Sequence, residues 1–253
     1  MFKNKEIKNK LIPVVFMAIL ILIWELVVEL GGIEKYILPS PSDILTVLFK
    51  EIKVIFPHML VTLYEGIGGF LISIVLSIIL AIAMDLVPIL KKAMYPLLVI
   101  TQTIPTIAIA PLFIIWFGFG ALPKIMVVIL MCFFPIVISI IDGLEGVDKD
   151  LVNHFKLMGA NKIKVFLHLK LPFGMIGFFS GLRIAATYSI MGAVVGEWLG
   201  GAEGLGVYMT RAKSAYALDK MFAAIIIIVI ISLLMVLLVT IIEKLVTPWN
   251  KEK

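Results

Sequence analysis

Six long apolar runs, separated by shorter polar segments, dominate the pattern of this chain. About 17–25 apolar residues in a helix, at ~1.5 Å per residue, cross the ~30 Å hydrocarbon layer of a bilayer. The pattern therefore predicts an all-α integral membrane protein that forms a single transmembrane domain over residues 1–253. The six expected transmembrane helices are residues 11–30, 61–84, 96–117, 125–141, 173–195 and 222–242.

The segments between these runs predict short connections. Residues 31–58 read as an extended linker in which Ser42 or Asp43 caps a short surface helix. Residues 85–95 and 118–124 read as turns, and 197–220 as a glycine-rich segment. The prolines of the third span are expected to bend it or to free carbonyl groups for a ligand. The basic start is not followed by a small-x-small cleavage site, which favours a first span over a secretory signal.

Residues 142–172, the loop between the fourth and fifth spans, predict a helix-turn-helix. Gly159 is expected to end the first helix, because glycine accepts the left-handed conformation of many helix stops. Asn161 is expected to cap a second short helix. Pro172 is expected to close that helix and to lie in the first turn of the fifth span. The apolar face of the first helix comprises Leu144, Val147, Leu151, Phe155 and Met158; that of the second comprises Ile163, Phe166 and Leu167.

This loop resembles the cytoplasmic loop of ABC-importer permeases, whose pattern is Glu-Ala-Ala, three residues, Gly, nine residues, Ile, one residue, Leu-Pro. Gly159 is followed by nine residues and then by Leu169, Lys170, Leu171 and Pro172. Leu169 stands in place of the isoleucine, and Asn153, His154 and Phe155 replace Glu-Ala-Ala. LPSPSDIL, QTIPTIAIAPLFIIWFGFG and GLRIAATYSIMGAVVGEWLGGAEGLGVYM are similar to the nitrate/sulfonate/taurine branch, the last also to permeases for pyrimidine precursors of thiamine such as hydroxymethylpyrimidine.

The resemblance implies a MetI-like ABC permease fold with a coupling helix-turn-helix between helices 4 and 5. It implies a transport subunit, not an enzyme, for a sulfonate-, nitrate- or taurine-like anion or a thiamine-precursor pyrimidine. Expected partners are ABC ATPase subunits, which would bind ATP and Mg²⁺, an extracytoplasmic solute-binding protein, and a second copy of the permease in a bacterial inner membrane. The residues expected to couple to the ATPase are Asn153, His154, Phe155, Met158, Gly159, Leu169, Leu171 and Pro172.

The distribution of basic residues predicts the orientation of the spans. If the N-terminus is cytoplasmic, segments 1–10, 85–95, 142–172 and 243–253 face inward and hold fourteen lysines. The segments 31–58, 118–124 and 197–220 then face outward and hold seven lysines and arginines. Because cytoplasmic loops carry the excess of basic residues, both termini are expected in the cytoplasm.

Composition and motifs limit the other functions. The chain is 62% hydrophobic and 15% charged, far from the ~45–50% and ~25% of soluble domains. It contains no GxxxxGK[ST] or HExxH motif, so no cofactor, nucleotide or metal site is expected on this chain. An intramembrane enzyme would need paired catalytic groups within the spans, whereas Glu25, Glu29, Glu65 and Glu197 map toward the outer interface. A membrane-anchored DNA-binding regulator is the other alternative, but the 142–172 loop offers no arginine for guanine contacts.

Two sets of residues in the spans are candidates for transport roles. Small residues at every fourth position of the fifth span favour close helix packing, either within one subunit or along the pathway or a second subunit. They form two series, the first of Gly177, Gly181, Ala185, Ser189 and Ala193 and the second of Gly192, Gly196 and Gly200. Arg183 is expected to have either a structural role, in which it pairs with a carboxylate or snorkels inward, or a transport role as an anion contact or gate, since a charge at membrane depth faces protein or water. Candidate pathway residues are Gln102, Thr103, Thr106, Arg183, Thr187 and Tyr188.

Overall fold

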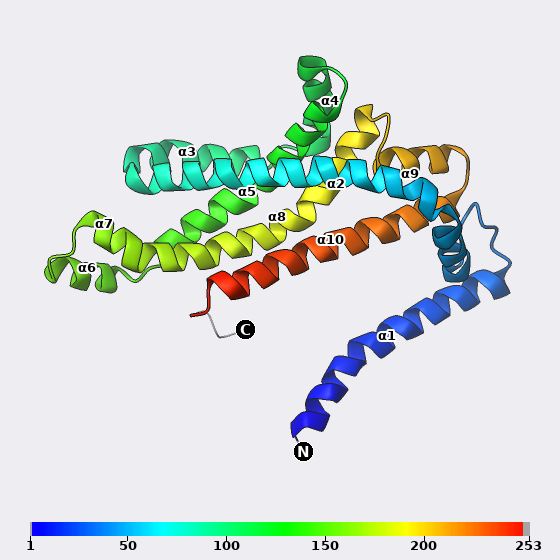
Figure 1. Ribbon diagram of the computed structural model, residues 1–253, viewed down its shortest axis with the longest axis horizontal. Helices are drawn as coiled ribbons and strands as arrows, with labels where there is room; N and C mark the ends of the chain where they lie inside the picture. The colour runs from blue at the N-terminus through cyan, green and yellow to red at the C-terminus, as the bar shows by residue number, and fades with distance from the viewer. Residues whose placement is uncertain (1, 250–253) are drawn as a thin grey trace. The chain divides into compact units, whose positions relative to one another are not determined.

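The computed structural model describes residues 2–249, and every regular element in that range is helical, as the apolar pattern predicts (Figure 1). Helix α1 ends before a short loop, and long helices then alternate with short ones. In chain order the elements are α1 (Phe2–Gly31), α2 (Pro41–Leu86), α3 (Pro88–Thr101), α4 (Thr106–Phe117), α5 (Ala121–Glu145), α6 (Lys149–Leu157), α7 (Lys162–Val165), the π-helical turn η1 (Phe166–Lys170), α8 (Leu171–Gly200), α9 (Leu205–Ser214) and α10 (Leu218–Val246).

Five helical stretches are long and apolar enough to cross a membrane, and a bent pair of shorter helices raises the number to six. The five stretches lie at Leu11–Gly31, Pro41–Leu86, Ala121–Glu145, Lys162–Gly200 and Leu218–Val246. Each contains one of the expected spans. The prediction of an all-helical membrane protein is therefore confirmed.

The third expected span, residues 96–117, is wrong as a continuous helix. The chain runs through α3 and α4, which meet at an angle of 102°, and α4 turns away from the direction of α3 in Figure 1. Pro105 explains the break, because it lacks an N–H and disfavours helical geometry at the residue before it. Since α3 begins at Pro88, most of residues 85–95 are helical rather than a turn.

The expected linker at 31–58 is also wrong over most of its length. Helix α2 begins at Pro41 and continues unbroken to Leu86, so only residues 32–40 connect it to α1. Proline suits the first position of a helix, where its missing N–H costs nothing. The cap is Ser40, whose Oγ accepts a hydrogen bond from the Asp43 N–H at 3.2 Å. Ser42 instead donates to Glu25 at 2.6 Å.

The chain forms two compact units, of which the first comprises the residues up to His58 together with Tyr208–Ile227. Lys220 pairs with Glu51 at 2.7 Å in this unit. Tyr208 is buried, and burial, with the negative charges of Glu51 and Asp219, raises the pKa of Tyr208 to about 12. Its hydroxyl oxygen has no hydrogen-bond partner among the described residues.

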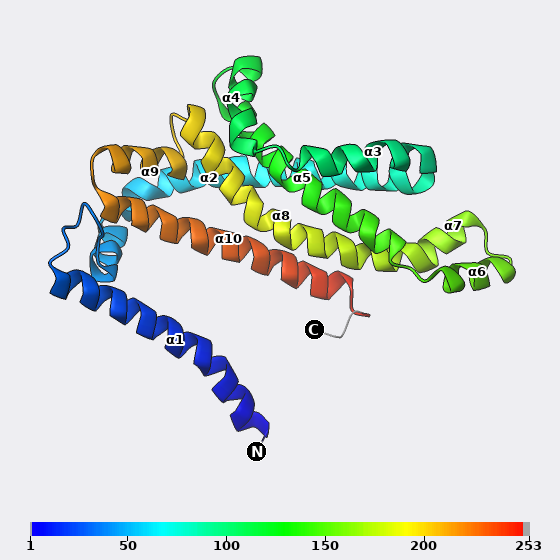
Figure 2. The same ribbon diagram turned by 180° about the vertical axis from the view of Figure 1, so that it is seen from behind.

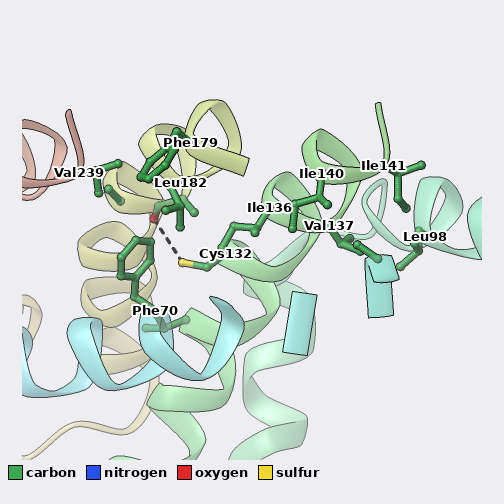
Figure 3. Close-up of a cluster of buried hydrophobic side chains, with 14 of the residues drawn as sticks. Phe70, Leu98, Cys132, Ile136, Val137, Ile140, Ile141, Phe179, Leu182 and Val239 are labelled. Atoms are coloured by element: carbon green, nitrogen blue, oxygen red, sulfur yellow. Dashed lines mark hydrogen bonds between the residues drawn. The ribbon is translucent and has the colours of Figure 1, made fainter. Parts of the chain in front are cut away.

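The second unit comprises Met59–Val207 and the chain from Ile228 onward, and its core surrounds α5 and α8. Cys132 is fully buried there and donates to the carbonyl oxygen of Ala185 at 3.3 Å (Figure 3). Apolar side chains from α2, α3, α5, α8 and α10 form one buried cluster with Cys132, among them Phe70, Leu98, Ile136, Leu182 and Val239.

Helices α5 and α8 lie side by side in both views of the molecule (Figures 1 and 2), and the small-residue stripe of α8 faces α5. A Cβ at Gly177 would lie 2.1 Å from the Ser139 carbonyl oxygen, and one at Gly181 would lie 2.8 Å from that of Pro135. A Cβ at Gly196 would lie 3.0 Å from the Cα of Lys124. Ala185 and Ser189 are fully buried. The stripe thus packs against α5 within one chain, which is one of the alternatives that its spacing leaves open.

Candidate functional site

A cavity of about 220 Å³ opens beside the break between α3 and α4. The break supplies Thr101, Gln102, Ile104 and Thr106, while α5 and α8 supply the opposite wall. At the break, the Gln102 and Thr103 N–H groups bond back to the carbonyls of Leu98 and Ile100. The opposite wall consists of Leu130, Met131, Phe134, Pro135 and Tyr188.

Three of the six candidate pathway residues line this cavity, and three do not. Gln102, Thr106 and Tyr188 come together there from separate helices. Thr103 is exposed beside the cavity, and its hydroxyl donates to the Ile100 carbonyl at 2.7 Å. Thr187 donates to the Arg183 carbonyl at 3.5 Å. Thr101 also lines the cavity, a residue that belongs to the same polar cluster in the sequence.

Arg183 pairs with a carboxylate, one of the two roles that its sequence position suggests. Its guanidinium forms an ion pair with Glu243 of α10 and also donates to Ser180 at 3.2 Å. Glu243 is 7% exposed. Sequence reasoning missed Glu243 because it lies at the end of the sixth run, sixty positions from Arg183.

A buried cluster of charged and polar residues, Thr62, Glu65, Lys124 and Glu197, lies at the end of α8 farthest from the 142–172 loop. Lys124 Nζ lies 2.6 Å from Glu65 Oε1, and neither residue is more than 6% exposed. Thr62 donates to Glu197 Oε1 at 2.6 Å. Two carboxyl groups and one ammonium thus lie out of water, where charges persist only when they are paired and hydrogen-bonded.

The same cluster fastens the loop that follows α8. Glu197 Oε2 accepts from the Gly206 N–H at 2.5 Å, and Thr62 Oγ1 accepts from the Leu205 N–H at 2.9 Å. Gly204 has a φ of +121°, and a Cβ there would lie 2.1 Å from the Glu197 carboxyl carbon. Sequence reasoning placed Glu65 and Glu197 at an interface with water and missed their burial. The glycines at 204 and 206, which follow Glu197 in the sequence, were the available signal.

The 142–172 loop contains the predicted helix stop and cap, but its first helix is shorter than expected. Gly159 has a φ of +81°, and the Asn161 side chain accepts from the Lys164 N–H at 2.9 Å, so both predictions are confirmed. The expected continuous face from Leu144 to Met158 is wrong. α5 ends at Glu145, and Asp148 caps the separate helix α6 by accepting from the Asp150 N–H at 2.8 Å.

Pro172 does not close the second short helix, contrary to the prediction, but its expected place in the first turn of the fifth span is confirmed. Residues 162–200 are continuously helical, and Pro172 lies in the first turn of α8 after the π-helical turn η1. The wider π turn lets the helix pass a residue that has no N–H. The structure thus joins the loop rigidly to the fifth span.

The tip of the loop exposes large apolar side chains. Leu157 and Met158, on either side of the end of α6, are 86% and 85% exposed, and Ile163 is 67% exposed. Of the expected coupling residues, Asn153, His154 and Gly159 are also exposed, and Phe155 and Pro172 are half-buried. Leu171 is 38% exposed, whereas Leu169 is buried at 8% and therefore positions the loop.

Ion pairs secure the end of the second unit that carries this loop. Lys170 of η1 lies 2.6 Å from Asp85 of α2. Lys91 of α3 pairs with Glu145 at the end of α5. These contacts join the base of the loop to α2, α3 and α5.

Comparison with known proteins identifies the family. Residues 73–250 match the family described as "Binding-protein-dependent transport system inner membrane component". The formylaminopyrimidine transport permease protein ThiX of Halalkalibacterium halodurans is 38% identical over 95% of this chain and 96% of its own length. The riboflavin transport system permease protein RibX of Chloroflexus aurantiacus is 30% identical over 94% and 89%, respectively. The putative aliphatic sulfonates transport permease protein SsuC of Bacillus subtilis is 29% identical over 96% and 87%.

The chain therefore belongs to the family of binding-protein-dependent transport system inner membrane components. It is the membrane-spanning permease subunit of an ABC transporter and not an enzyme. Its partners include an ABC ATPase and a solute-binding protein.

Proposed function

From this family membership we propose that two copies of the chain form the translocation pathway of an ATP-driven importer. ATP and Mg²⁺ bind to the separate ATPase subunits, and an extracytoplasmic solute-binding protein delivers the cargo. The cargo is a small solute, either a sulfonate-, nitrate- or taurine-like anion or a thiamine-precursor pyrimidine. Relatives named for aliphatic sulfonates and for formylaminopyrimidine support both classes.

The exposed apolar tip of the 142–172 loop is the observation that carries the coupling role. Leu157 and Met158 project from a segment that is otherwise rich in lysine and asparagine. Apolar side chains exposed on a polar surface mark contact sites for other proteins. The loop docks on the ATPase through these side chains.

The continuity of the loop with α8 supports a mechanism for this coupling. Movement of the ATPase displaces α6 and η1, and the ion pair between Lys170 and Asp85 carries the displacement to α2. The packed α5–α8 pair moves as one body because glycine contacts leave no space for sliding. The cavity beside the α3–α4 break then alternates between the two sides of the membrane by a rigid-body switch.

Both termini and the loop lie in the cytoplasm in this proposal. The excess of fourteen basic residues over seven supports that orientation. In a Cys132→Ser background, a cysteine introduced at the exposed Lys156 should react with impermeant thiol reagents only from the cytoplasmic side. A cysteine at the exposed Ala202 should react only from outside, and the reverse pattern would contradict both the orientation and the docking role.

Gly159→Val tests the coupling role itself. A β-branched residue at a φ of +81° is strained by ~1–3 kcal/mol, which changes the angle between α6 and α7 while the spans stay intact. The reconstituted transporter should keep a membrane-inserted permease but lose ATPase association or cargo uptake. Matched measurements on Gly146→Val, a glycine with a negative φ of −65°, control for added bulk at a helix end. Normal association, hydrolysis and uptake in Gly159→Val would remove the loop from the mechanism.

A further inference from the structure

The cavity beside the α3–α4 break has an uncharged lining. Its polar groups are the hydroxyls of Thr101, Thr106 and Tyr188 and the amide of Gln102. No lysine, arginine, histidine or carboxylate belongs to the lining among the described residues. Burying an anion without a cation is costly, whereas hydroxyl and amide groups match the donors and acceptors of a neutral ring.

Arg183 is the basic side chain of α8 closest in sequence to Tyr188, and it is directed elsewhere. Five helical positions separate the two residues, which places them about 140° apart around the helix. The Arg183 guanidinium is engaged by the buried carboxylate of Glu243 and by Ser180. A sulfonate or nitrate in the cavity would therefore receive no charge compensation from Arg183.

The remaining lining suits an aromatic ring. Phe134 and Tyr188 offer ring faces and edges, and Met131 offers a thioether, which favours contact with aromatic groups. Gln102 is exposed at the break, and its described side-chain hydrogen bond is a long one, 3.5 Å from Nε2 to the Leu98 carbonyl. Its amide therefore retains the capacity to bind a ring nitrogen and an adjacent amino group.

We propose that this cavity binds a small, uncharged, planar nitrogen heterocycle, with Gln102 as the residue that hydrogen-bonds to its polar edge. A volume of about 220 Å³ lies below the ~300–1,000 Å³ of pockets for drug-sized ligands, which fits a small ring compound. The inference rests on the proposed transport function and narrows its cargo to one of the two classes.

Cysteine protection measures binding in this cavity without involving the solute-binding protein. In a Cys132→Ser background, a cysteine at Thr106 reports on the cavity, and a cysteine at Thr103 reports on the exposed surface beside it. A formylaminopyrimidine should slow alkylation of the Thr106→Cys permease–ATPase complex severalfold. Ethanesulfonate at the same concentration should not, and neither probe should protect Thr103→Cys. Equal protection by ethanesulfonate, or no protection by the pyrimidine, would overturn the inference.

Substitutions at Gln102 provide a second test. Gln102→Leu should raise the pyrimidine concentration needed for half protection about tenfold, because the ring then loses its hydrogen bonds to the Gln102 amide. Gln102→Arg adds a cation to the cavity and should introduce protection by ethanesulfonate. If Gln102→Leu leaves the pyrimidine protection unchanged, Gln102 does not read the ring.

A charge exchange separates cargo recognition from helix packing at Arg183. The double variant Arg183→Glu with Glu243→Arg keeps an ion pair and should retain protection by the pyrimidine. Loss of protection by the pyrimidine in a complex that still assembles would place Arg183 in cargo binding and overturn the inference. ATPase association, measured on the same samples, reports on the proposed transport function independently, because protection requires no hydrolysis.

Discussion

The two ends of the second unit handle polarity in opposite ways. At one end, Glu65, Lys124 and Glu197 are charged residues hidden from water and paired with one another or with backbone N–H groups. At the other end, the apolar side chains of Leu157 and Met158 are exposed. The charged groups of the polar end pair within one chain, with Glu65 Oε2 alone left without a described partner, and the apolar end is the one at which we propose a partner binds.

This difference teaches how to recognise a contact site on a membrane subunit. Exposure of apolar groups along the spans is uninformative, since lipid covers them. Only about a third of the hydrophobic window of α2 is buried in the chain itself, and only 6% of that of α1. Exposed leucine and methionine at the tip of a lysine-rich loop carry information, because water surrounds that loop.

Lys124→Met should produce the largest effect, because methionine has about the volume of lysine but removes the cation from a buried ion pair. Breaking such a pair costs ~3–5 kcal/mol, so the midpoint of thermal unfolding in detergent should fall by roughly 10 °C. The exposed Lys213→Met is the matched control. The double variant Glu65→Met with Lys124→Met should recover part of the loss, since neither charge then stays unpaired. Equal stability of Lys124→Met and wild type would refute the assignment of Lys124 and Glu65 as a stabilising buried ion pair.

Gly181→Leu should produce the next largest effect, because the comparison assumes that α5 and α8 connect the two ends as one body. The new Cβ would lie 2.8 Å from the Pro135 carbonyl and 2.9 Å from the Ile136 Cα, which are backbone atoms that cannot move aside. Overpacking of this kind costs ~1–3 kcal/mol or more and should reduce the yield of assembled permease. Gly68→Leu is the control, since only Ile125 Cδ1 lies near its Cβ position, at 3.9 Å. Normal assembly and transport by Gly181→Leu would show that the crossing tolerates separation.

Leu157→Asp combined with Met158→Asp should separate stability from association. Both side chains are exposed, so the free energy of unfolding of the variant should stay within ~0.5 kcal/mol of that of wild type. Its affinity for the ATPase, measured by surface plasmon resonance in nanodiscs, should fall at least about tenfold, or ~1.4 kcal/mol. Leu169→Asp should do the reverse and destabilise the fold, because Leu169 is 8% exposed. Unchanged ATPase affinity in the double variant would mean that the apolar tip is not the contact.

Tyr208→Phe should produce the smallest effect. It tests whether a buried hydroxyl without a hydrogen-bond partner contributes to stability. The Tyr208 hydroxyl is buried without a described hydrogen-bond partner, whereas Glu65 Oε1 and both carboxylate oxygens of Glu197 accept hydrogen bonds. Its removal should change stability by less than ~0.5 kcal/mol or stabilise the fold slightly below pH 10. The raised pKa of Tyr208 means that its contribution to stability is complete below pH ~10 and declines as pH rises toward 12. Wild type should therefore lose stability over that alkaline range, and Tyr208→Phe should lose less. A loss above 1 kcal/mol at neutral pH would indicate that the hydroxyl has a structural role.

Sequence reasoning was most accurate where structure depends on neighbouring residues. It predicted the helical membrane class, the left-handed stop at Gly159 and the cap at Asn161, since each depends on a few adjacent positions. It failed at Pro105 and at Pro41–Leu86. A proline is compatible with both a bent helix and a break, and a lysine-bearing amphipathic stretch is compatible with both a surface helix and an extension of a span.

The sequence by itself determined that the chain crosses a membrane in long helices and presents a helix-turn-helix between the fourth and fifth spans, because hydrophobic length and local caps are written in consecutive residues. Only the tertiary structure decided that Arg183 pairs with Glu243, that Lys124 pairs with Glu65, and that Thr62 holds Glu197. The partners are separated by 59 to 135 positions. Which charge meets which depends on how helices cross, and those crossings are set by side-chain packing over the whole unit.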